Sequence, residues 1–473
     1  MLQKNKRTSE KSEIAEHIDS RKISRRKVLT AGVLAPLIIP RYVLGQTGDR
    51  KAPSDTLNIA AVGIGGMGKN YIEGCKSENI AALADVDDKL GAPVYELYPK
   101  ARTYRDYRIM LEKEKGIDAV IIGTPDHSHA VVAMTAIGLG KHVYVAKPMT
   151  RTIHEARVIT KAAREANVAT QMSVQSCASD EALTTAEWIQ AGAVGNVHEI
   201  HVWSDRPVWP QGIARPSDTP PVPSWLDWDV WLGPAPERSY HPFYHPFDFR
   251  GWYDFGTGAL GDMACHSFHA FFPVLKLGLP SSVSACTTFA RVPAGDLPPD
   301  PEWSRSRPVQ SKETFPPSSI VTWDFPARDN LPPVRMYWYD GGLTPPLPMG
   351  LDISRRLGSD GVIFIGDKGA MITGFTGGPI RLDNEREKSF EPPPKTLQRT
   401  QGHYLEWIEA CKGGKPANCN FEFGSLITEV ALLGVIAQRM DRYMEWDSEN
   451  ALFTNYDEAN VLVNPPYRTG WSL

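Results

Sequence analysis

Residues 57–72 read LNIAAVGIGGMGKNYI, an apolar strand that runs into a glycine-rich turn and then a helix. Gly63, Gly65 and Gly68 stand in the spacing G-x-G-x-x-G, and Gly66 and Met67 fill the two positions before the last glycine. The first glycine allows a tight turn, the second lets the backbone approach a pyrophosphate at a helix N-terminus, and the third lets helix and strand pack closely. This stretch therefore predicts the nucleotide-binding turn of a Rossmann domain.

The next apolar run, Ile80–Ala84, ends in Asp85, 17 residues past Gly68. A carboxylate at the end of the second strand accepts hydrogen bonds from the adenosine ribose hydroxyls and repels a 2′-phosphate. We therefore expect NAD, with NADP less favoured. Asp87 and Asp88 add negative charge nearby.

The alternation of strand and helix continues beyond this point. Further buried strands are expected at 118–123, 141–148 and 168–173. Apolar strands separated by amphipathic helices predict a doubly wound parallel sheet, whose ligands bind at the carboxyl ends of the strands. Thr124, Pro125, His129 and Lys147 fall at such ends, so we expect them beside the nucleotide. We place this Rossmann domain at residues 56–175.

The second half of the chain, residues 176–473, has a different pattern. Strands with alternating or β-branched and aromatic residues are expected at His198–Trp203, Ser282–Phe289, Ser319–Phe325, Val334–Tyr339, Gly361–Ile365 and Ala370–Thr373. This pattern predicts an α+β domain with a large, mostly antiparallel sheet, one face of which packs against helices. The proline-rich stretches 293–317 and 392–394 are expected to be surface loops.

The segment between Asp205 and Arg250 holds ten prolines and four tryptophans, Trp209, Trp225, Trp228 and Trp231. Indole faces stack on the apolar faces of sugar rings, so this loop region is a candidate lining for a glycoside site. Alternatively, the same aromatic side chains seal the loop against the domain or across a dimer. The sequence does not favour either alternative.

The charge of the chain is distributed unevenly. The whole chain of 473 residues carries a formal net charge of -4. Residues 1–45 hold ten Lys/Arg against four Asp/Glu, which leaves 41 against 51, a net charge of -10, for the remainder. An acidic body of this kind argues against a nucleic-acid partner, because phosphate binding needs a basic face.

The basic leader contains an export motif. Residues 24–29 read SRRKVL, and the apolar run behind them is too short to span a membrane, which takes roughly 20 residues. The pattern resembles a twin-arginine signal, with Val28 where the motif usually has Phe, and such signals export folded proteins. We expect a signal peptide at 1–45, a linker at 46–55, transport by the twin-arginine machinery and a periplasmic or otherwise exported protein. The alternative is a basic tail with a chance arginine pair.

The six cysteines show neither a C-x-x-C pair nor a zinc-ligand spacing. A chain that folds before export need not rely on disulfides, so scattered core thiols are the expected state. A Cys411–Cys419 bridge outside the cell is the alternative. His127 and His129 form a two-histidine pattern without a third ligand, so we predict no metal site.

Several motifs together resemble the Gfo/Idh/MocA oxidoreductase family. They are the glycine turn, T-P-x-x-x-H at 124–129, K-P at 147–148, WLGPAP at 231–236, RGW at 250–252, GTGALGDMACH at 256–266 and FGSLITEVALL at 423–433. The resemblance covers nearly the whole chain after the leader. It implies a nicotinamide-dependent enzyme acting on sugars, polyols or their derivatives, often a dimer or tetramer built through the second-domain sheet. Some exported relatives hold their nucleotide tightly, which explains why a chain would fold before export.

The resemblance also implies three catalytic residues. Lys147 matches a lysine beside the nicotinamide and the reacting hydroxyl, and His266 matches the usual proton acceptor of hydride transfer. Asp262 precedes His266 by four residues and, on a helix, would share its face and orient the substrate or the imidazole. The chain departs from the family pattern at Ala146, where a glutamate is usual, and at His269, where an acidic residue often stands.

Three functions remain open at this point. The first is an exported NAD-dependent dehydrogenase that acts on a secondary hydroxyl or ketone of a sugar or glycoside. The second is a glycoside hydrolase that works through a transient 3-keto sugar, although the G-G-x-x-Y-P-T-H pattern associated with that branch is absent. The third is a noncatalytic sugar-binding or scaffold protein, which only the substitution at Ala146 favours.

Overall fold

The structure is a computed structural model that describes residues 55–293, 306–309, 311–348, 357–374, 378–381 and 391–473. The predicted signal at 1–45 and nearly all of the predicted linker at 46–55 lie outside these residues. Residues 56–473 form one unit, and the description below concerns that unit.

The first sheet is the predicted parallel Rossmann sheet. Its strands are β1 Asn58–Val62, β2 Asn79–Ala84, β3 Arg102–Tyr104, β4 Ala119–Ile122, β5 His142–Val145 and β6 Thr170–Met172. They lie in the order β3-β2-β1-β4-β5-β6, with every pairing parallel. The connecting helices are α2 Met67–Gly74, α3 Asp88–Leu97, α4 Tyr107–Lys113, α5 His129–Gly138 and α6 Ile153–Glu165. Five of the six strands were predicted, and the short, half-exposed edge strand β3 was not.

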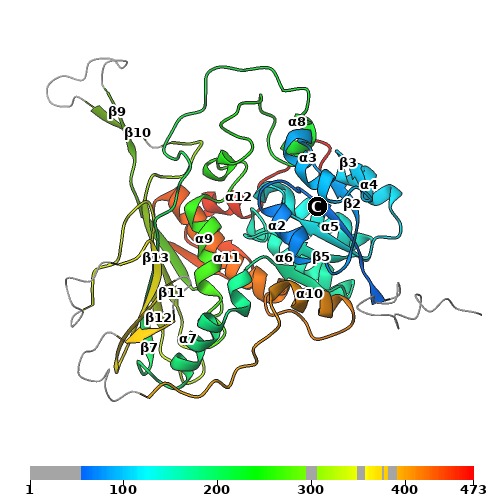
Figure 1. Cartoon of the computed structure of the whole chain (residues 1–473). Helices are drawn as coiled ribbons and strands as arrows, with labels where there is room; N and C mark the ends of the chain where they lie inside the picture. Colours follow the sequence, from blue (N-terminus) through cyan, green and yellow to red (C-terminus); the bar gives the residue numbers. More distant parts are fainter. Residues whose placement is uncertain (1–54, 294–305, 310, 349–356, 375–377, 382–390) are drawn as a thin grey trace, which may run out of the picture. The chain divides into compact units, whose positions relative to one another are not determined.

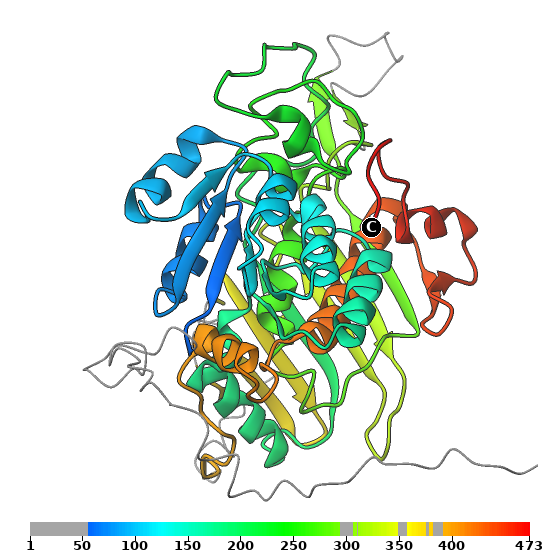
Figure 2. The same ribbon diagram turned by 90° about the vertical axis from the view of Figure 1, so that its right-hand side faces the viewer.

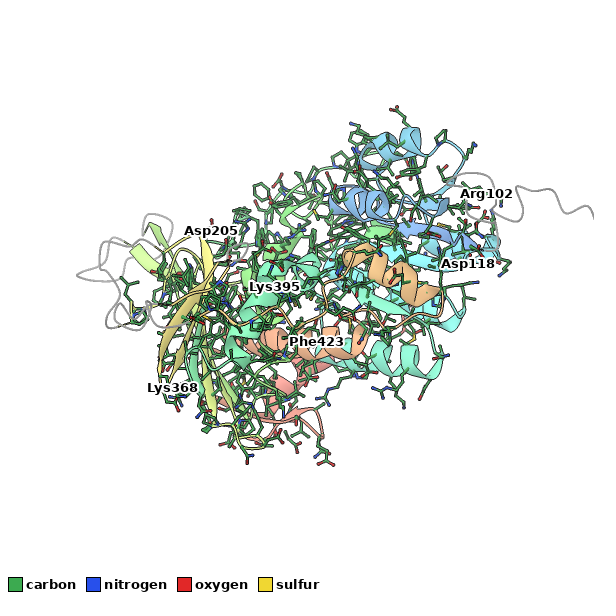
Figure 3. All side chains as sticks on the ribbon, turned by 60° about the horizontal axis from the view of Figure 1, so that its bottom comes forward. Arg102, Asp118, Asp205, Lys368, Lys395 and Phe423 are labelled. Atoms are coloured by element: carbon green, nitrogen blue, oxygen red, sulfur yellow. The ribbon has the colours of Figure 1, made fainter. Side chains whose placement is uncertain are left out.

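The second sheet is large and mostly antiparallel, as predicted. Its strands are β7 Val197–Ser204, β8 Ser282–Thr287, β11 Ser319–Phe325, β12 Val334–Tyr339, β13 Asp360–Gly366, β14 Gly369–Thr373, β15 Ile380–Arg381, β16 Met444–Asp447 and β17 Leu452–Phe453. They lie in the order β15-β14-β13-β7-β12-β11-β8-β16-β17, and only β7 and β12 pair in parallel. In Figure 3, Asp205, just past β7, and Lys368, in the β13–β14 turn, lie at opposite ends of this sheet.

One loop prediction is wrong in part. The stretch 293–317 was expected to be a surface loop, but it contains strand β10 Ser306–Val309, which pairs with β9 Ala290–Pro293 in a two-stranded ladder. Local composition does not show that a segment pairs with a strand earlier in the chain. The prolines of this stretch favoured a loop, so strand β10 was not predicted.

Helices fill the space between the two sheets, as Figure 1 shows. They include α7 Asp180–Gln190, α9 Gly258–Phe268 and α11 Phe421–Met440. Helix α11 packs against α6 of the Rossmann domain on one side and against α9 and strand β8 on the other. Among the described residues α11 alone is long and apolar enough to cross a membrane, but 83% of its apolar window is buried inside the fold, as expected for a core helix.

Helix α10 His403–Cys411 returns from the end of the chain to the Rossmann domain, which the sequence analysis did not predict. Trp407 of this helix is fully buried in the apolar cluster that covers β1 and β2. Tyr404 stacks on Tyr144 of β5, with ring centroids 5.7 Å apart. The two halves of the chain are therefore interleaved rather than simply consecutive.

The remaining elements are short. They are the helix α8 Trp228–Leu232, the helix α12 Asn460–Val463 and the 3-10 turns η3 Asp126–Ser128, η4 Gln175–Ala178, η5 Asp248–Gly251 and η7 Asp457–Ala459. The six cysteines are free, and Cys75, Cys177, Cys265 and Cys419 are buried. Four of the six cysteines are thus the expected core thiols, whereas Cys286 is exposed and Cys411 is partly buried, and Cys411 and Cys419 are both free thiols in the structure.

Candidate active site

A cavity of about 710 Å³ lies at the carboxyl ends of the Rossmann strands. The glycine turn after β1 and Asp85 after β2 form one end of its wall, and Lys147 after β5, Asp262 and His266 of α9 line it as well. Residues of the loop between β7 and α9 complete the wall. The position agrees with the rule that open α/β sheets bind ligands at the carboxyl ends of their strands.

The glycine turn has the shape that a dinucleotide requires. A Cβ on Gly68 would lie 2.0 Å from the carbonyl oxygen of Gly63, so only glycine lets α2 approach β1 this closely. Gly66 has a φ of +49°, and no atom lies within 4 Å of the place a Cβ would take. Gly63, Gly65, Gly66 and Met67 line the cavity, whereas Gly68 lies behind it in the packing role predicted for it.

Asp85 stabilises the glycine turn from below. Its Oδ2 accepts hydrogen bonds from the backbone N–H groups of Ile64 (2.9 Å) and Gly65 (3.2 Å), and its Oδ1 accepts one from Asp87 (3.0 Å). Burial raises the pKa of Asp85, and these backbone hydrogen bonds oppose the rise. The carboxylate lines the cavity, and because each oxygen has two lone pairs it can also accept from a ribose hydroxyl.

Of the residues after β4 that were predicted to lie beside the nucleotide, two line the cavity and one does not. Thr124 and Pro125 line the cavity, and Thr124 Oγ1 is buried with no hydrogen-bond partner among the described residues. His129, predicted beside the nucleotide, is instead 1% exposed and behind the wall. Its Nδ1 lies 2.9 Å from Pro148 O and its Nε2 lies 2.8 Å from Thr124 O. It therefore fixes the backbone of the two wall segments and does not itself face the cavity.

Lys147 and Asp262 form a half-buried ion pair. The Nζ of Lys147 donates to Oδ1 and to the backbone oxygen of Asp262, each at 2.6 Å. The guanidinium of Arg250 contributes a longer contact, with Nε 3.3 Å from the same Oδ1. Burial alone would raise the pKa of Asp262, but the charges of Lys147 and Arg250 outweigh it and lower the pKa to about 2. Asp262 is therefore a carboxylate at neutral pH.

His266 lies on α9 four residues after Asp262, as predicted, and faces the same cavity. Burial, together with the nearby charge of Lys147, lowers the pKa of His266 well below its usual value. A neutral imidazole in this position has a lone pair with which it can accept a proton. Lys147 lies about 115 residues before Asp262 and His266 in the sequence, and the structure brings the three side chains together.

Comparison with known families agrees with this geometry. Residues 57–174 match the family described as an oxidoreductase family with an NAD-binding Rossmann fold, and residues 208–277 match the C-terminal alpha/beta domain of the same family. The chain therefore carries both matched domains of the Gfo/Idh/MocA oxidoreductase family. Its first domain is accordingly an NAD-binding Rossmann domain.

Similar Gfo/Idh/MocA sequences include enzymes of sugar and polyol chemistry. Levoglucosan dehydrogenase of Pseudarthrobacter phenanthrenivorans is 24% identical over 221 residues, which are 44% of this chain and 49% of that protein. The scyllo-inositol 2-dehydrogenase (NAD(+)) of Bacillus subtilis is 24% identical over 171 residues, 35% of this chain and 46% of that protein. The chain thus matches about half the length of these relatives.

Among solved structures, the WlbA dehydrogenase of Bordetella pertussis, in complex with NADH and UDP-GlcNAcA, superimposes with a TM-score of 0.56. It is 15% identical and covers 83% of this chain and 99% of its own. At this identity the likeness supports the Gfo/Idh/MocA fold, and the site has to be argued from the chain's own residues.

The chain's departure from the Gfo/Idh/MocA pattern at Ala146 has a visible compensation. Ala146 lines the cavity and packs with the apolar cluster of the Rossmann sheet. The ammonium of the adjacent Lys147 is held by Asp262 instead of by a neighbouring glutamate. The structure therefore keeps the lysine in place without the usual carboxylate.

Ser173 and Tyr71 line the cavity but were not predicted from the sequence, and Arg250 was not predicted either. Ser173 follows β6, and its Oγ accepts a hydrogen bond from the Lys147 backbone N–H and forms another, at 3.0 Å, with the Tyr71 hydroxyl. Burial raises the pKa of Tyr71 to about 12, so it stays a neutral phenol. Ser173 ends a predicted strand, so the carboxyl-end rule could have found it, whereas Tyr71 on α2 carries no sequence signal.

The tryptophans between Asp205 and Arg250 fit both of the predicted roles, lining the site and sealing the loop. Trp209 and Trp231 line the cavity, although each is less than 5% exposed. Trp228 stacks on Trp231 with ring centroids 4.5 Å apart, inside an aromatic cluster of the loop itself. Trp225 lies apart from these rings, with Lys89 Nζ 3.3 Å from its ring centroid. Most of the indole surface therefore seals the loop, and two rings also shape the cavity.

The same loop is fastened to the ribose end of the Rossmann domain. Asp88 N donates to Trp225 O (3.0 Å), and Asp227 N donates to Val86 O (2.9 Å). His245 Nε2 lies 2.8 Å from Asp87 Oδ2, and both side chains are buried. Figure 2 shows the green loop region above the blue strands, and Figure 1 shows α8 beside α3. These contacts join the loop between β7 and α9 to the segment that follows Asp85. We call this set of contacts the strap.

No group of three or more His, Cys, Asp or Glu side chains in the described part of the chain is placed to hold a metal ion. The candidate metal ligand His127 is fully buried, with its ring nitrogens 3.2 Å from Phe255 O and 2.8 Å from Trp231 O. Its role in the structure is to join η3 to the loop between β7 and α9.

Proposed function

We propose that this protein is an NAD-dependent oxidoreductase that transfers a hydride between the nicotinamide and a secondary hydroxyl, or its ketone, in a sugar, polyol or glycoside. The observation that carries the proposal is the meeting of Lys147, Asp262 and His266 in the cavity that begins at the glycine turn. The sugar and polyol dehydrogenases among its relatives support the substrate class.

Each residue has a distinct task in this proposal. NAD, when bound, supplies the hydride acceptor. His266, neutral because of its burial, accepts the hydroxyl proton as general base. Lys147 has three N–H donors and directs hydrogen bonds to two oxygen atoms of Asp262, which leaves one donor for the developing alkoxide. Asp262 holds the ammonium in place.

We also propose that the nucleotide is held tightly and loaded before export. The strap closes over the segment that follows Asp85, so release of the adenosine end requires these contacts to open. Such retention fits export by the twin-arginine machinery to the periplasm, which we propose from residues 24–29. Replacing Arg25 and Arg26 by lysine should leave the protein in the cytoplasmic fraction, and unchanged export would contradict the proposed route.

We further propose a homodimer or homotetramer built on the outer face of the large sheet. Side chains on the face turned away from α9 and α11 form a separate apolar cluster, whose buried members are Trp203, Tyr339 and Ile363, with partly buried Ile320 and Tyr337 packed against it. A second copy of the chain would cover the apolar side chains that stay partly exposed on this face, and exposed apolar patches often mark protein–protein interfaces.

A panel of sugars tests the activity and separates the alternatives. The purified protein is incubated with levoglucosan, scyllo-inositol, glucose, glucuronate and aryl glycosides, and both NADH and released aglycone are measured. Formation of NADH with a keto product supports the proposal. Release of aglycone without net NADH would instead identify the glycoside hydrolase, and failure to bind NAD or NADP would leave the noncatalytic alternative.

A further inference from the structure

His266 lines a second, smaller cavity in addition to the large one. This cavity has a volume of about 30 Å³ and is enclosed by η4, α7, α9 and strands β13 and β14. Ser176, Glu181, Thr185 and His269 contribute polar side chains to its wall. It belongs to neither the glycine turn nor the loop between β7 and α9, so the proposed nucleotide site does not account for it.

Buried polar atoms in this cavity lack protein partners. Ser176 Oγ and both ring nitrogens of His269 are buried and form no hydrogen bond of normal geometry with any described residue. Contacts with backbone groups of Cys265, Ser176 and His266 oppose the larger effect of burial on the pKa of His269, but they do not have the geometry of a normal hydrogen bond. Buried polar groups bond to protein or to ordered water, and a polar cavity above roughly 10–15 Å³ admits a water molecule. The cavity therefore has the room and the partners for water.

The chemistry of His266 requires a way out for a proton. A proton accepted by His266 produces a positive ring close to Lys147, and burial and this charge lower the pKa of His266 well below its usual value. The imidazolium is thus unfavourable, and a substrate bound in the large cavity would lie between His266 and the solvent on that side. A fast turnover needs the proton to leave by another path.

We propose that the proton leaves His266 through the small cavity, along water held by His269 and Ser176, and reaches solvent at Glu181. This inference rests on the proposed function. Glu181 lies in the first turn of α7, lines the cavity and is exposed. In the oxidation direction the substrate O–H bond breaks, its proton passes to His266, and an equivalent proton leaves the water chain at the carboxylate. Only protons move along this path, because the hydride goes to the nicotinamide.

His269 suits such a relay because it is neutral. Burial lowers the pKa of His269 to about 4, and a neutral imidazole has one N–H donor and one acceptor nitrogen. The ionisable groups that line this path are Glu181 from α7, His266 from α9 and His269 just after it. Asp262 from α9, Lys147 after β5 and His403 from α10 act on these histidines through their charge. The described wall residues from β13 and β14 carry no charge.

The first arm of the test is structural and needs no substrate. A high-resolution crystal structure of the wild type should show ordered water bonded to Ser176 Oγ and a ring nitrogen of His269. The His269→Phe variant, which keeps the ring volume but no nitrogen, should lose that water. A dry cavity in a well-ordered wild-type crystal would overturn the proposal regardless of activity.

The second arm is kinetic and uses the sugar of the panel with the highest rate. Glu181→Gln and His269→Phe should each lower kcat at least ~3-fold, which is less than the effect of removing the general base itself. KM should not change, and the solvent deuterium isotope effect on kcat should become larger. Added imidazole or formate buffer should restore the rate of Glu181→Gln. Glu165→Gln, an equally exposed carboxylate on α6, is the matched control and should behave as wild type.

The kinetic outcomes separate the relay from the proposed function. If His266→Asn slows turnover but Glu181→Gln and His269→Phe match the wild type in kcat and isotope effect, the relay is wrong and the base is retained. If His266→Asn is itself fully active, or if no sugar in the panel is oxidised, the proposed function fails, and the crystal structure still decides whether the cavity holds water.

Discussion

At the scale of single residues, the site depends on how burial and charge act on Lys147, Asp262 and His266. Burial opposes charge on both Asp262 and His266, yet the outcomes differ. Asp262 has Lys147 and Arg250 beside it and stays ionised, whereas His266 has the same lysine beside it and stays neutral. Lys147 therefore favours both protonation states that the proposed reaction needs, with Arg250 adding to its effect on Asp262 and burial as the larger cause at His266.

The role of His266 predicts the effect of its removal. His266→Asn keeps a polar side chain of similar size but cannot accept a proton, so kcat should fall by ~10²-fold or more, as expected for a general base. Binding of NAD, measured by calorimetry or fluorescence, should be unchanged because the glycine turn is untouched. A fall in kcat of less than about tenfold would show that His266 is not the general base.

The low pKa of Asp262 predicts a pH dependence of stability. The folded pKa, about 2, lies below the usual value near ~3.9, so the folded state binds this proton less readily than the unfolded state. The stabilisation is thus present above the usual pKa and is lost as pH falls through about 2. Urea unfolding of wild type and Asp262→Asn should show a stability difference at pH 6 that shrinks steadily at more acid pH. A difference that does not depend on pH would contradict the ion-pair account.

Sequence reasoning predicted three residues that the structure brings into one cavity, Lys147, Asp262 and His266, but not all of their contacts. Lys147 follows a strand and Asp262 and His266 share a helix face, and both of these patterns are local. The contact of Tyr71 with Ser173 joins positions 102 residues apart in sequence. Arg250 and Asp262 are only 12 residues apart, but their contact depends on how η5 packs against α9, which no periodic pattern predicts. His129 matched a family segment, yet both of its ring nitrogens are taken by backbone carbonyls, which only the packing reveals.

At the scale of elements, long apolar strands were predictable and short or returning elements were not. Strands β11 and β12 have the predicted bounds, since their inward and outward residues alternate regularly. The edge strand β3 has three residues and no buried side chain, and α10 is placed by aromatic contacts with β5. Tertiary contacts determine where such elements form, and the local sequence pattern carries no information about these contacts.

The close approach of α2 to β1 predicts the cost of enlarging Gly68. In Gly68→Ala the new Cβ would lie 2.0 Å from Gly63 O, so the helix must shift, and overpacking of this kind costs about 1–3 kcal/mol. We expect a lower thermal midpoint and weaker binding of NAD. Gly138→Ala in α5, where nothing lies within 4 Å of the new methyl, is the matched control and should be neutral or slightly stabilising. Equal midpoints for the two variants would contradict the packing role.

The strap predicts slow release of the nucleotide. His245→Ala removes the buried contact with Asp87 and should speed release of bound NADH, measured by stopped-flow chase, by roughly 10-fold, the equivalent of about 1.4 kcal/mol. His241→Ala, whose partner Asp218 is 75% exposed, should release at the wild-type rate. Unchanged release from His245→Ala would show that the strap does not retain the nucleotide.

At the scale of the whole molecule, the large sheet links the site to assembly. Helices α9 and α11 pack on its inner face, and α9 carries Asp262 and His266. The outer face holds the apolar cluster around Trp203 and Tyr339. A second subunit on that face would therefore stiffen the layer on which the catalytic helix rests.

This arrangement predicts the state of the protein in solution. Light scattering after gel filtration should give the mass of a dimer or tetramer. Tyr337→Lys, on the outer face where His201 stacks on the tyrosine ring at 4.9 Å, should shift the mass toward the monomer, because a buried unpaired charge is costly. Lys368→Glu, in the turn between β13 and β14, should leave the mass unchanged. A wild-type monomer at micromolar concentration would refute this proposal.

The most direct test of the central claim is the absorbance spectrum of the purified protein before and after the sugar panel is added. The account predicts that nucleotide co-purifies or binds stoichiometrically as NAD, and that at least one sugar or polyol converts it to NADH in wild type but not in His266→Asn. Bound NAD that no sugar or polyol reduces would contradict the proposed chemistry, and a protein that binds neither NAD nor NADP would contradict the account of the site.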